Sequence, residues 1–191
     1  MDNENKRLSG KTIAILVANG FEEAEMTETQ KALVAEGATA RIVSPENGLC
    51  NGWHEGTWGH NFYVEVKVNE VLPSQYDGLL LPGGERSLKT LLENAHARRI
   101  VKGMVDANKA VGVLSDGVEM LAAVEAIAGR NVTGAPESRE KVEQAGGIWS
   151  DGQAVSDGRL VTSRGGEDLP AFVEAFLEAV ENGDASAREA A

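Results

Sequence analysis

The sequence predicts a single α/β domain with a flavodoxin-like, doubly wound and mostly parallel sheet that has helices on both faces. Short apolar runs without polar alternation recur along the chain, as is typical of strands buried on both faces of a parallel sheet. Helix-like segments separate these runs, which is the order of βαβ units with right-handed crossovers. The length of 191 residues suits one domain, and no internal repeat or linker interrupts it.

The first half of the chain contains a βαβ opening followed by a further buried strand. Acidic residues in the first turn of the first helix suit the helix dipole, while Gly37 and Pro45 end that helix and the next strand. The stretch Trp53–His60, rich in Gly and Trp, is expected to be a loop. The expected strands are residues 12–18, 38–44, 63–68 and 77–81, and the expected helices are 22–36 and, as one or two helices, 87–108.

The second half begins with a strand at residues 111–114 and a helix that ends at residue 128. Gly146-Gly147 stops a later helix, and Asp151-Gly152 and Asp157-Gly158 are expected to be turns between short strands. The other expected elements are strands at residues 131–133, 148–149, 154–155 and 160–162 and helices at 137–145 and 169–180. The domain is expected to span residues 11–181, with a polar extension at 1–10 and a frayed tail at 182–191.

Composition excludes several classes of function. With 18 basic and 30 acidic residues, the formal net charge is −12, which disfavours nucleic acid and anionic membranes as partners. The apolar runs are far shorter than the roughly 20 residues that cross a bilayer, and residues 1–7 lack the apolar core of a signal peptide, so a cytoplasmic location is expected. The single cysteine, Cys50, excludes an internal disulfide and a cysteine-based metal cluster; neither a metal nor a cofactor is predicted.

The most informative segment is the turn Ser115-Asp116-Gly117, which joins the apolar strand 111–114 to the helix beginning at Val118. A strand that turns sharply into a helix, with a small polar side chain at the tip, is the geometry of a nucleophile elbow. The hydrolase motif G-x-S-x-G is not met, because Gly112 lies three residues before Ser115 rather than two. Residues 19–22 and 82–84 should join this turn at the carboxyl edge of the sheet, where doubly wound folds bind ligands.

Several motifs together resemble the ThiJ/PfpI superfamily, in particular its PfpI-type intracellular protease and stress-protein branch. They are Asn19-Gly-Phe-Glu22, Tyr76-Asp-Gly-Leu-Leu-Leu-Pro-Gly-Gly84, Ser115-Asp-Gly117, Ala145-Gly-Gly-Ile-Trp-Ser-Asp151 and Thr162-Ser-Arg-Gly-Gly-Glu-Asp-Leu-Pro-Ala-Phe172. The resemblance implies a flavodoxin-like sandwich and a homodimer, sometimes a hexamer. The family's elbow reads Ala-Ile-Cys-His-Gly; its Cys is a low-pKa thiolate that the His assists and that a Glu after the first strand hydrogen-bonds.

Carried over by motif, the family's Glu is Glu22, its nucleophile position is Ser115 and its His position is Asp116. The Gly83-Gly84 turn would supply a backbone oxyanion donor, and Gly117 and Arg164 would complete the pocket. The chain departs from the pattern at three further places. They are Val118 where Pro usually follows the elbow Gly, Leu88 near where the proteolytic branch places an acid contributed across subunits, and Gly165 or Gly166 where Ser-Arg-x-Pro has Pro.

These replacements change the chemistry that the resemblance implies. A serine hydroxyl needs an adjacent base, normally His, whereas a thiol is already partly ionised near neutrality. A carboxylate is a weak base unless burial or a second carboxylate raises its pKa, and a Glu22–Asp116 pair that shares a proton could polarise Ser115.

The sequence therefore favours a non-catalytic or repurposed small-molecule-binding, stress-associated protein whose ligand is unknown. The alternative is a hydrolase that acts through Ser115 with Glu22 and Asp116, either a PfpI-like amidase or peptidase or a glyoxalase- or deglycase-like enzyme. A purely structural assembly protein is a third interpretation.

Other reactive side chains have plainer interpretations. Cys50 lies outside the elbow and is expected to be a bystander thiol rather than a nucleophile. His54 and His60 are expected at the surface or in a dimer contact, with metal binding or general-base work as the alternative. His96 is expected to face solvent, and Arg164 to be either an ion-pair partner or an anion site near the elbow.

Overall fold

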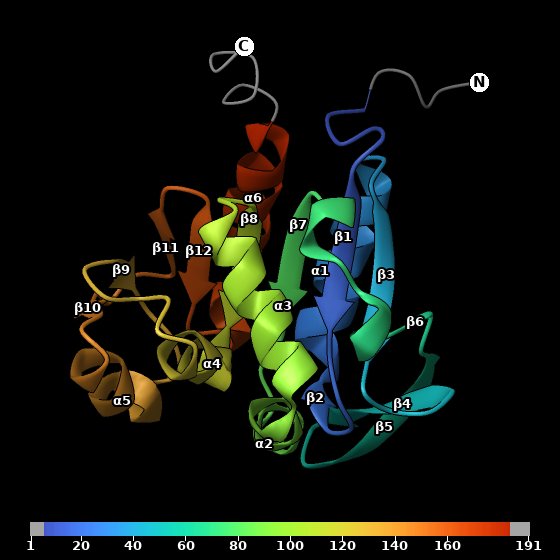
Figure 1. Cartoon of the computed structure of the whole chain (residues 1–191), viewed down its shortest axis with the longest axis horizontal. Helices are drawn as coiled ribbons and strands as arrows, with labels where there is room; N and C mark the ends of the chain where they lie inside the picture. Colours follow the sequence, from blue (N-terminus) through green and yellow to red (C-terminus); the bar gives the residue numbers. More distant parts are fainter. Residues whose placement is uncertain (1–5, 184–191) are drawn as a thin grey trace.

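The computed structural model describes residues 6–183 and is built around a seven-stranded sheet. The strand order is β11-β12-β8-β7-β1-β3-β6, and neighbouring strands are parallel except β11 with β12. Figure 1 shows helices in front of and behind this sheet, which confirms the predicted α/β fold. Its strands are β1 (Thr12–Leu16), β3 (Thr39–Ser44), β6 (Val66–Lys67), β7 (Gly78–Leu81), β8 (Ala110–Leu114), β11 (Ala154–Asp157) and β12 (Leu160–Ser163).

Alternate residues of the central strands face two separate hydrophobic cores. In β1, Ala14 and Leu16 pack into the core under α3 (Ala95–Asp106) and α4 (Val118–Ala123). Ile13 and Ile15 point the other way, into the core under α1 (Glu23–Ala35) and α6 (Leu169–Glu181). Because both faces of the sheet are covered, its central strands are apolar throughout and carry no polar alternation.

Packing on the second of these faces requires a glycine in the centre of β8. Phe172 and Phe176 of α6 stack with their ring centroids 5.7 Å apart, and both side chains are fully buried. A Cβ atom at Gly112 would lie 2.8 Å from a Phe172 ring atom and 2.7 Å from a Phe176 ring atom. Glycine therefore lets α6 lie directly on the sheet beside the elbow strand.

The expected helices are present with shifted ends. The stretch 87–108 forms two helices, α2 (Glu85–Glu93) and α3, because Asn94 ends the first and caps the second. The Asn94 side chain accepts a hydrogen bond of 3.0 Å from the backbone N–H of Ala97, as N-cap residues commonly do. The helix after the elbow, α4, ends at Ala123 rather than at residue 128, and α5 is short (Arg139–Gln144).

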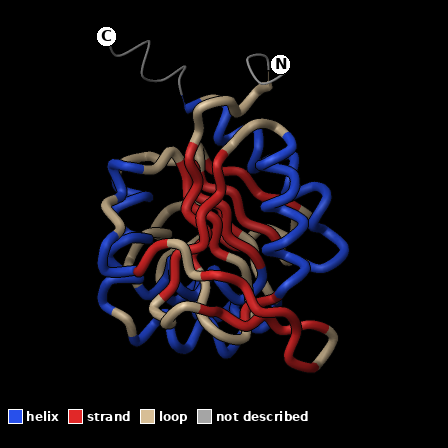
Figure 2. Tube along the Cα trace, turned by 90° about the vertical axis from the view of Figure 1, so that its right-hand side faces the viewer, coloured by secondary structure: helices blue, strands red, loops and turns tan. Residues whose placement is uncertain are grey.

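The expected loop Trp53–His60 is instead part of a β-hairpin, and that prediction was wrong. Strands β4 (Leu49–His54) and β5 (Thr57–Tyr63) pair antiparallel and join β2 (Phe21–Glu22) in a second sheet. Their turn, Glu55-Gly56, has φ of 47° and 80°, the left-handed pair of a tight hairpin. Figure 2 shows the hairpin extending beyond the body of the domain. Tyr63 ends β5, so the strand expected at 63–68 is reduced to the short β6.

The short strands after α5 pair differently from the expectation. Strand β10 (Ile148–Trp149) pairs in parallel with β9 (Asn131–Val132) in a separate two-stranded sheet, so Asp151-Gly152 is not a hairpin turn. Asp157-Gly158 does connect two antiparallel strands, β11 and β12, as predicted. The short apolar segments in this region predict strands, but they do not determine which strands pair with each other.

The two ends of the described chain lie at the same pole of the domain, opposite the carboxyl ends of the parallel strands (Figure 1). Arg7 connects them, because it forms ion pairs with Glu174 and Glu181 of α6 at 3.0 and 2.9 Å. Within the extension expected at residues 1–10, Leu8 is fully buried in the core, while residues 1–5 and most of the expected tail at 182–191 lie outside the described residues.

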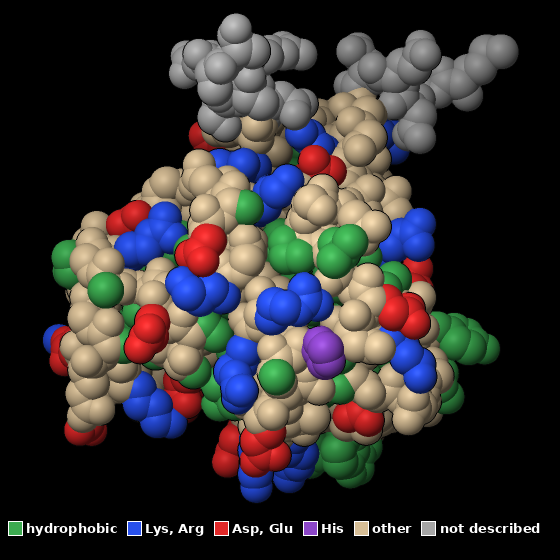
Figure 3. Space-filling model, viewed as in Figure 1, with side chains coloured by type: hydrophobic (Ala, Val, Ile, Leu, Met, Phe, Trp, Pro, Cys, Tyr) green, Lys and Arg blue, Asp and Glu red, His purple; other side chains and the backbone are tan. Residues whose placement is uncertain are grey.

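The outer surface is mixed in charge where α3 and α4 cover the sheet. Figure 3 shows Lys and Arg side chains interspersed with Asp and Glu on this face rather than gathered in one groove. Within residues 6–183, no helix combines the length and the apolar character needed to cross a membrane.

Candidate functional site

The turn after β8 has the sharp geometry of an elbow. Ser115 has a left-handed φ of 53°, uncommon for a residue other than glycine, and the 3₁₀ turn Ser115–Gly117 leads directly into α4. Gly117 is buried, and a Cβ atom there would lie 3.1 Å from Val113 and 3.3 Å from the carbonyl oxygen of Leu81. The close approach of this turn to β7 therefore requires a small residue.

A buried carboxyl group and a carbonyl group hold the Ser115 hydroxyl. Ser115 Oγ hydrogen-bonds Glu25 Oε1 and lies 3.0 Å from the carbonyl oxygen of Arg164. The other carboxyl oxygen of Glu25 accepts a hydrogen bond of 2.7 Å from the backbone N–H of Gly83. Burial raises the pKa of Glu25 to about 7, against the opposing effect of its hydrogen bonds with Ser115 and Gly83.

The protonation state of Glu25 decides how these hydrogen bonds run. A hydroxyl group has one hydrogen to donate. When Glu25 is protonated, its O–H donates to Ser115 Oγ, and Ser115 donates to the carbonyl of Arg164, so that all three groups are paired. When Glu25 is ionised, Ser115 donates to the carboxylate and the carbonyl loses its donor. The geometry accordingly suits a neutral carboxyl group.

The carboxylate that contacts the elbow is therefore Glu25, and the assignment of that contact to Glu22 was wrong. Glu22 belongs to β2, immediately before α1, and lines the same pocket without a hydrogen bond to Ser115. Burial and the charge of Asp116 raise the pKa of Glu22, while His54 lowers it. In the helix expected at residues 22–36, the spacing of three residues would put Glu22 and Glu25 on one face, a signal that could have pointed to Glu25 as a further candidate.

Asp116 points away from Ser115 toward the glycine turn. Its Oδ1 accepts a hydrogen bond of 2.8 Å from the backbone N–H of Gly84. Burial raises the pKa of Asp116, which the bond from Gly84 opposes. The Gly83-Gly84 turn was predicted to supply a backbone oxyanion donor, but the N–H groups of both glycines are bound to carboxyl groups of the chain itself.

The sequence left two roles open for Arg164, an ion-pair partner or an anion site, and the structure shows the ion pair. Its guanidinium group binds Asp168 at 2.6 and 3.2 Å, so only its backbone carbonyl contacts Ser115. The next residue, Gly165, has a φ of 83°, and a Cβ atom there would overlap Ser115 Oγ and the Glu25 carboxyl group. Glycine at this position therefore lets the strand end close over the serine.

A pocket of about 640 Å³ at the carboxyl edge of the sheet is lined by Ser115 together with Glu22, Glu25, Gly84, Asp116 and Arg164, but not by Gly83 or Gly117. Leu88 also lines it, near the place where the resemblance implies an acid. Both cations of the lining are paired: Lys141 lies 2.6 Å from Glu119, and Arg164 binds Asp168. The acidic side chains of the lining are Glu22, Glu25, Glu85, Asp116, Glu119 and Glu137. The pocket is therefore strongly acidic.

Cys50 lies outside this pocket. It is fully buried in β4, and the Ser44 hydroxyl lies 3.8 Å from its sulfur. Burial raises the pKa of its thiol to about 11. The side chain is accordingly a protonated, inaccessible thiol, as expected of a bystander.

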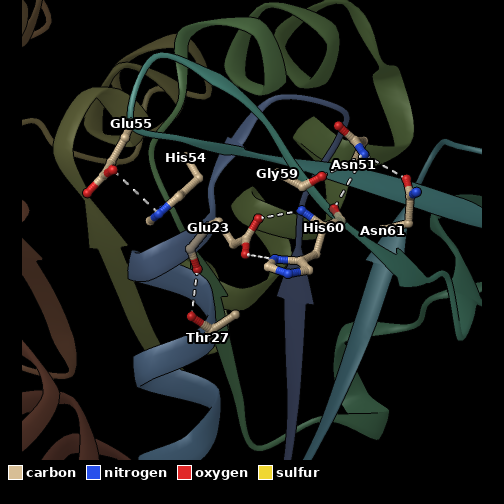
Figure 4. Close-up of polar contacts among 8 residues, drawn as sticks. All are labelled: Glu23, Thr27, Asn51, His54, Glu55, Gly59, His60 and Asn61. Atoms are coloured by element: carbon tan, nitrogen blue, oxygen red, sulfur yellow. Dashed lines mark hydrogen bonds and ion pairs between the residues drawn. The ribbon is translucent and has the colours of Figure 1, made fainter.

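The two histidines of the hairpin also lie outside the pocket lining. His60 contacts Glu23 through its ring and its backbone N–H, whereas His54 lies 3.9 Å from the exposed Glu55 (Figure 4). Across residues 6–183, no three His, Cys, Asp or Glu side chains are grouped so that they could hold a metal ion.

The fold and the site define a class of protein: a doubly wound α/β domain with a polar side chain at a strained elbow above a buried glutamate. The family model described as DJ-1/PfpI matches residues 11–179. The chain belongs to the DJ-1/PfpI family.

Curated relatives and solved structures agree with this membership. A deglycase of Thermococcus kodakarensis is 32% identical over 166 residues, which cover 87% of this chain and 97% of the deglycase. General stress protein 18 of Bacillus subtilis is 31% identical over 173 residues, covering 90% and 99% of the two chains. The structure of Schizosaccharomyces pombe DJ-1, with 21% identity and a TM-score of 0.77, covers 92% of this chain and 97% of its own and has the same fold.

Proposed function

We propose that this protein binds a small molecule in the elbow pocket and has lost the cysteine chemistry that the family resemblance implies. The observation that carries the proposal is the environment of Ser115: its hydroxyl is held between the Glu25 carboxyl group and the carbonyl of Arg164. None of the residues that line the pocket, all of them among the described residues, is a histidine or a cysteine. Similarity to a general stress protein supports a stress-associated role.

The local hydrogen bonds oppose nucleophilic attack by Ser115. A serine becomes a nucleophile when a base accepts its proton, and a protonated Glu25 instead donates to the oxygen that would attack. A tetrahedral intermediate also needs free N–H donors, and those of Gly83 and Gly84 are occupied by Glu25 and Asp116. At pH values below about 7, where Glu25 is mostly protonated, carboxyl groups of the chain itself thus oppose both requirements of acyl-transfer chemistry.

The charge of the pocket supports a ligand that is neutral or cationic. Acidic side chains dominate the lining, and its two cations are already neutralised by Glu119 and Asp168. An anionic ligand would meet repulsion without a free cation to bind it, whereas hydroxyl or amine groups could hydrogen-bond the carboxylates.

A second candidate is a hydrolase in which Ser115 attacks and Glu25 is the base. The pKa of Glu25 favours it, because a base titrating near 7 is well matched to catalysis at neutral pH. Its substrates would be those of a PfpI-like amidase or peptidase or of a deglycase-like enzyme. This mechanism requires Gly83 or Gly84 to release its carboxyl partner when substrate binds.

The two candidates are separated by assaying methylglyoxal consumption and peptide hydrolysis with the wild type, Ser115→Ala and Cys50→Ser. We expect no turnover above background in any of the three. Turnover that Ser115→Ala and Glu25→Gln both abolish would establish the hydrolase and overturn the proposal. Turnover that only Cys50→Ser abolishes would show that the buried thiol is the nucleophile.

A gain-of-function variant provides the matched positive control. The double substitution Ser115→Cys with Asp116→His, in a Cys50→Ser background, restores the family's reactive pair in the same pocket. A helix N-terminus and a nearby imidazolium both lower a thiol pKa. We expect iodoacetamide labelling with a midpoint clearly below the free-thiol value of about 8.5. A midpoint at that value would mean that the pocket no longer supports a thiolate.

A further inference from the structure

The β4–β5 hairpin holds a histidine ring against a buried carboxylate, away from the elbow pocket. Glu23, the first residue of α1, is only 7% exposed. Its Oε1 lies 2.5 Å from Nδ1 of His60, and its Oε2 accepts a hydrogen bond of 2.8 Å from the backbone N–H of the same residue (Figure 4). The His60 side chain is otherwise 84% exposed. One carboxylate thus fixes both the backbone and the ring of an accessible histidine.

Two glycines of the hairpin make room for this carboxylate. A Cβ atom at Gly52 of β4 or at Gly59 of β5 would collide with the Glu23 carboxyl group. Neither glycine is among the residues with positive φ, so the need is for space and not for backbone conformation. The carboxyl group of Glu23 therefore lies in space that both strands leave open by carrying glycine.

The carboxylate determines which ring nitrogen of His60 carries the proton. Burial raises the pKa of Glu23, but the hydrogen bonds and charge of His60 outweigh it, and the resulting pKa lies below the ordinary value. An ionised carboxylate only accepts hydrogen bonds, so Nδ1 carries a proton in this contact, and in the neutral form of the ring the lone pair then lies on Nε2. Among the described residues Nε2 has no hydrogen-bond partner, and the exposure of the ring leaves it open to solvent.

We propose that Nε2 of His60 is a nucleophile toward neutral acyl donors, with Glu23 as its positioning residue, at a site separate from the elbow. Neutral donors are specified because the carboxylate of Glu23 lies beside His60, and Glu22 and Glu55 lie near His54 of the same hairpin, so anionic donors such as acyl phosphates are disfavoured. In the reaction Nε2 bonds to the acyl carbon and the bond to the leaving oxygen breaks, so that the leaving group departs with the electron pair. The Nδ1 proton passes to solvent through Glu23, and water then hydrolyses the acylimidazole to the free acid and imidazole.

The other two histidines of the chain are internal controls. His54 contacts only the exposed carboxylate of Glu55, at 3.9 Å, and His96 lies on α3. The probe is p-nitrophenyl acetate, and the readout is the acetylation rate of each histidine, measured by mass spectrometry of quenched digests. Peptide-level mapping separates acetylation at His60 from any at Ser115, so the outcome is independent of the proposed elbow function.

We expect His60 to be acetylated about tenfold faster than His54 and His96, the scale on which a histidine-orienting carboxylate acts. In Glu23→Gln an amide N–H can donate to Nδ1 and reverse the tautomer, so the His60 rate should fall to that of the other two. Glu55→Gln, the matched control beside His54, should leave the His60 rate unchanged. Equal rates at the three histidines, or a His60 rate unaffected by Glu23→Gln, would overturn the proposal.

A measurement on the unmodified chain keeps the proposal testable if Glu23→Gln fails to fold. Long-range ¹H–¹⁵N correlation spectra report which nitrogen of a neutral imidazole is protonated. We expect His60 as the Nδ1–H form. Protonation of His60 on Nε2 would contradict the geometry and remove the nucleophile.

Discussion

Glu25 links the proton balance of the elbow pocket to the stability of the fold. Its ordinary pKa of 4.5 becomes about 7 in the folded protein, mainly through burial. The pKa values of Glu22 and Asp116 are raised as well, also chiefly by burial. The folded state therefore binds protons more tightly than the unfolded chain over this pH range.

The raised pKa of Glu25 determines the direction in which the free energy of unfolding changes with pH. The stabilisation from a protonated Glu25 is complete below pH 4.5 and is lost as the pH rises toward 7. At about 1.4 kcal/mol per pKa unit, the free energy of unfolding should fall by about 3 kcal/mol across this window. Urea unfolding at pH 5 and pH 8 measures it. Glu25→Gln, which keeps a neutral hydrogen-bonding group, should remove most of the difference.

The matched control for this experiment is Glu28→Gln, because Glu28 lies on the same helix and is exposed. It should leave the pH dependence unchanged. If Glu25→Gln kept the full difference between pH 5 and pH 8, the proton would reside elsewhere in the pocket.

A second prediction concerns oxidation at the elbow. Peroxide oxidises a reactive thiolate to sulfenic and then sulfinic acid, and a hydroxyl group cannot undergo this oxidation. We expect mild hydrogen peroxide to leave the peptide containing residues 113–117 unmodified, with any mass gain on Cys50, methionine or tryptophan. Ser115→Cys supplies the positive control, since its elbow thiol should gain oxygen. An oxygen adduct on the wild-type elbow peptide would refute the prediction.

At the scale of elements, the sequence best predicts the strands that are buried on both faces of the sheet. The central strands are short apolar runs that end at Gly, Pro or Ser, and β1, β7 and β8 fall where these runs predict them. The β4–β5 hairpin could not be found in this way. Its strands are mostly exposed, its glycines interrupt any alternation, and its turn is Glu55-Gly56 rather than the usual Asn-Gly or Asp-Gly.

The candidate site, too, can be predicted from the sequence only in part. Chain order locates Ser115 and the Gly83-Gly84 turn, because strand ends of a parallel sheet meet at one edge. It does not determine which of Glu22, Glu23 and Glu25 faces that edge, since the direction of each side chain depends on how β2 enters α1. Glu25 reaches Ser115, while Glu23 points to the hairpin and holds His60.

A third prediction tests the contact between β8 and α6. Gly112→Ala would place a methyl group against the stacked rings of Phe172 and Phe176, both of which are fully buried. Overpacking of this kind costs roughly 1–3 kcal/mol, so urea unfolding should show a loss in that range. Adding Phe176→Leu should recover part of it, giving a favourable coupling in the double-mutant cycle. Strictly additive losses would mean that the methyl group is accommodated elsewhere.

At the scale of the whole molecule, we propose that the protein is a homodimer. An apolar groove of about 530 Å³ lies between α1 and α6, and Val34 of α1 is 53% exposed. The groove is lined by Ala32, Ala35, Leu169, Pro170 and Val173, with Lys31, Glu28 and Glu174 also contributing. A rim that carries both charges can pair with a second copy of itself across a twofold axis.

Light scattering after size exclusion tests this proposal. We expect twice the chain mass of 20.2 kDa for the wild type. Val173→Lys, which places a charge in the groove, should shift the protein toward the monomer. Ile148→Lys, at an exposed apolar position in β10 away from the groove, should leave the dimer intact. A wild type that elutes as a monomer at micromolar concentration would exclude the dimer.

The Arg7 ion pairs with α6 have a further consequence for how the protein can be handled. They hold the start of the described chain beside its last helix, at the pole opposite the carboxyl ends of the parallel strands (Figure 1), whereas the elbow pocket lies at those carboxyl ends. A support or a fused domain attached at either end would thus leave the pocket facing the solution. The proximity of Arg7 to the end of α6 also suits circular permutation, in which a linker connects these two segments and the chain is opened at an exposed turn such as Glu55-Gly56.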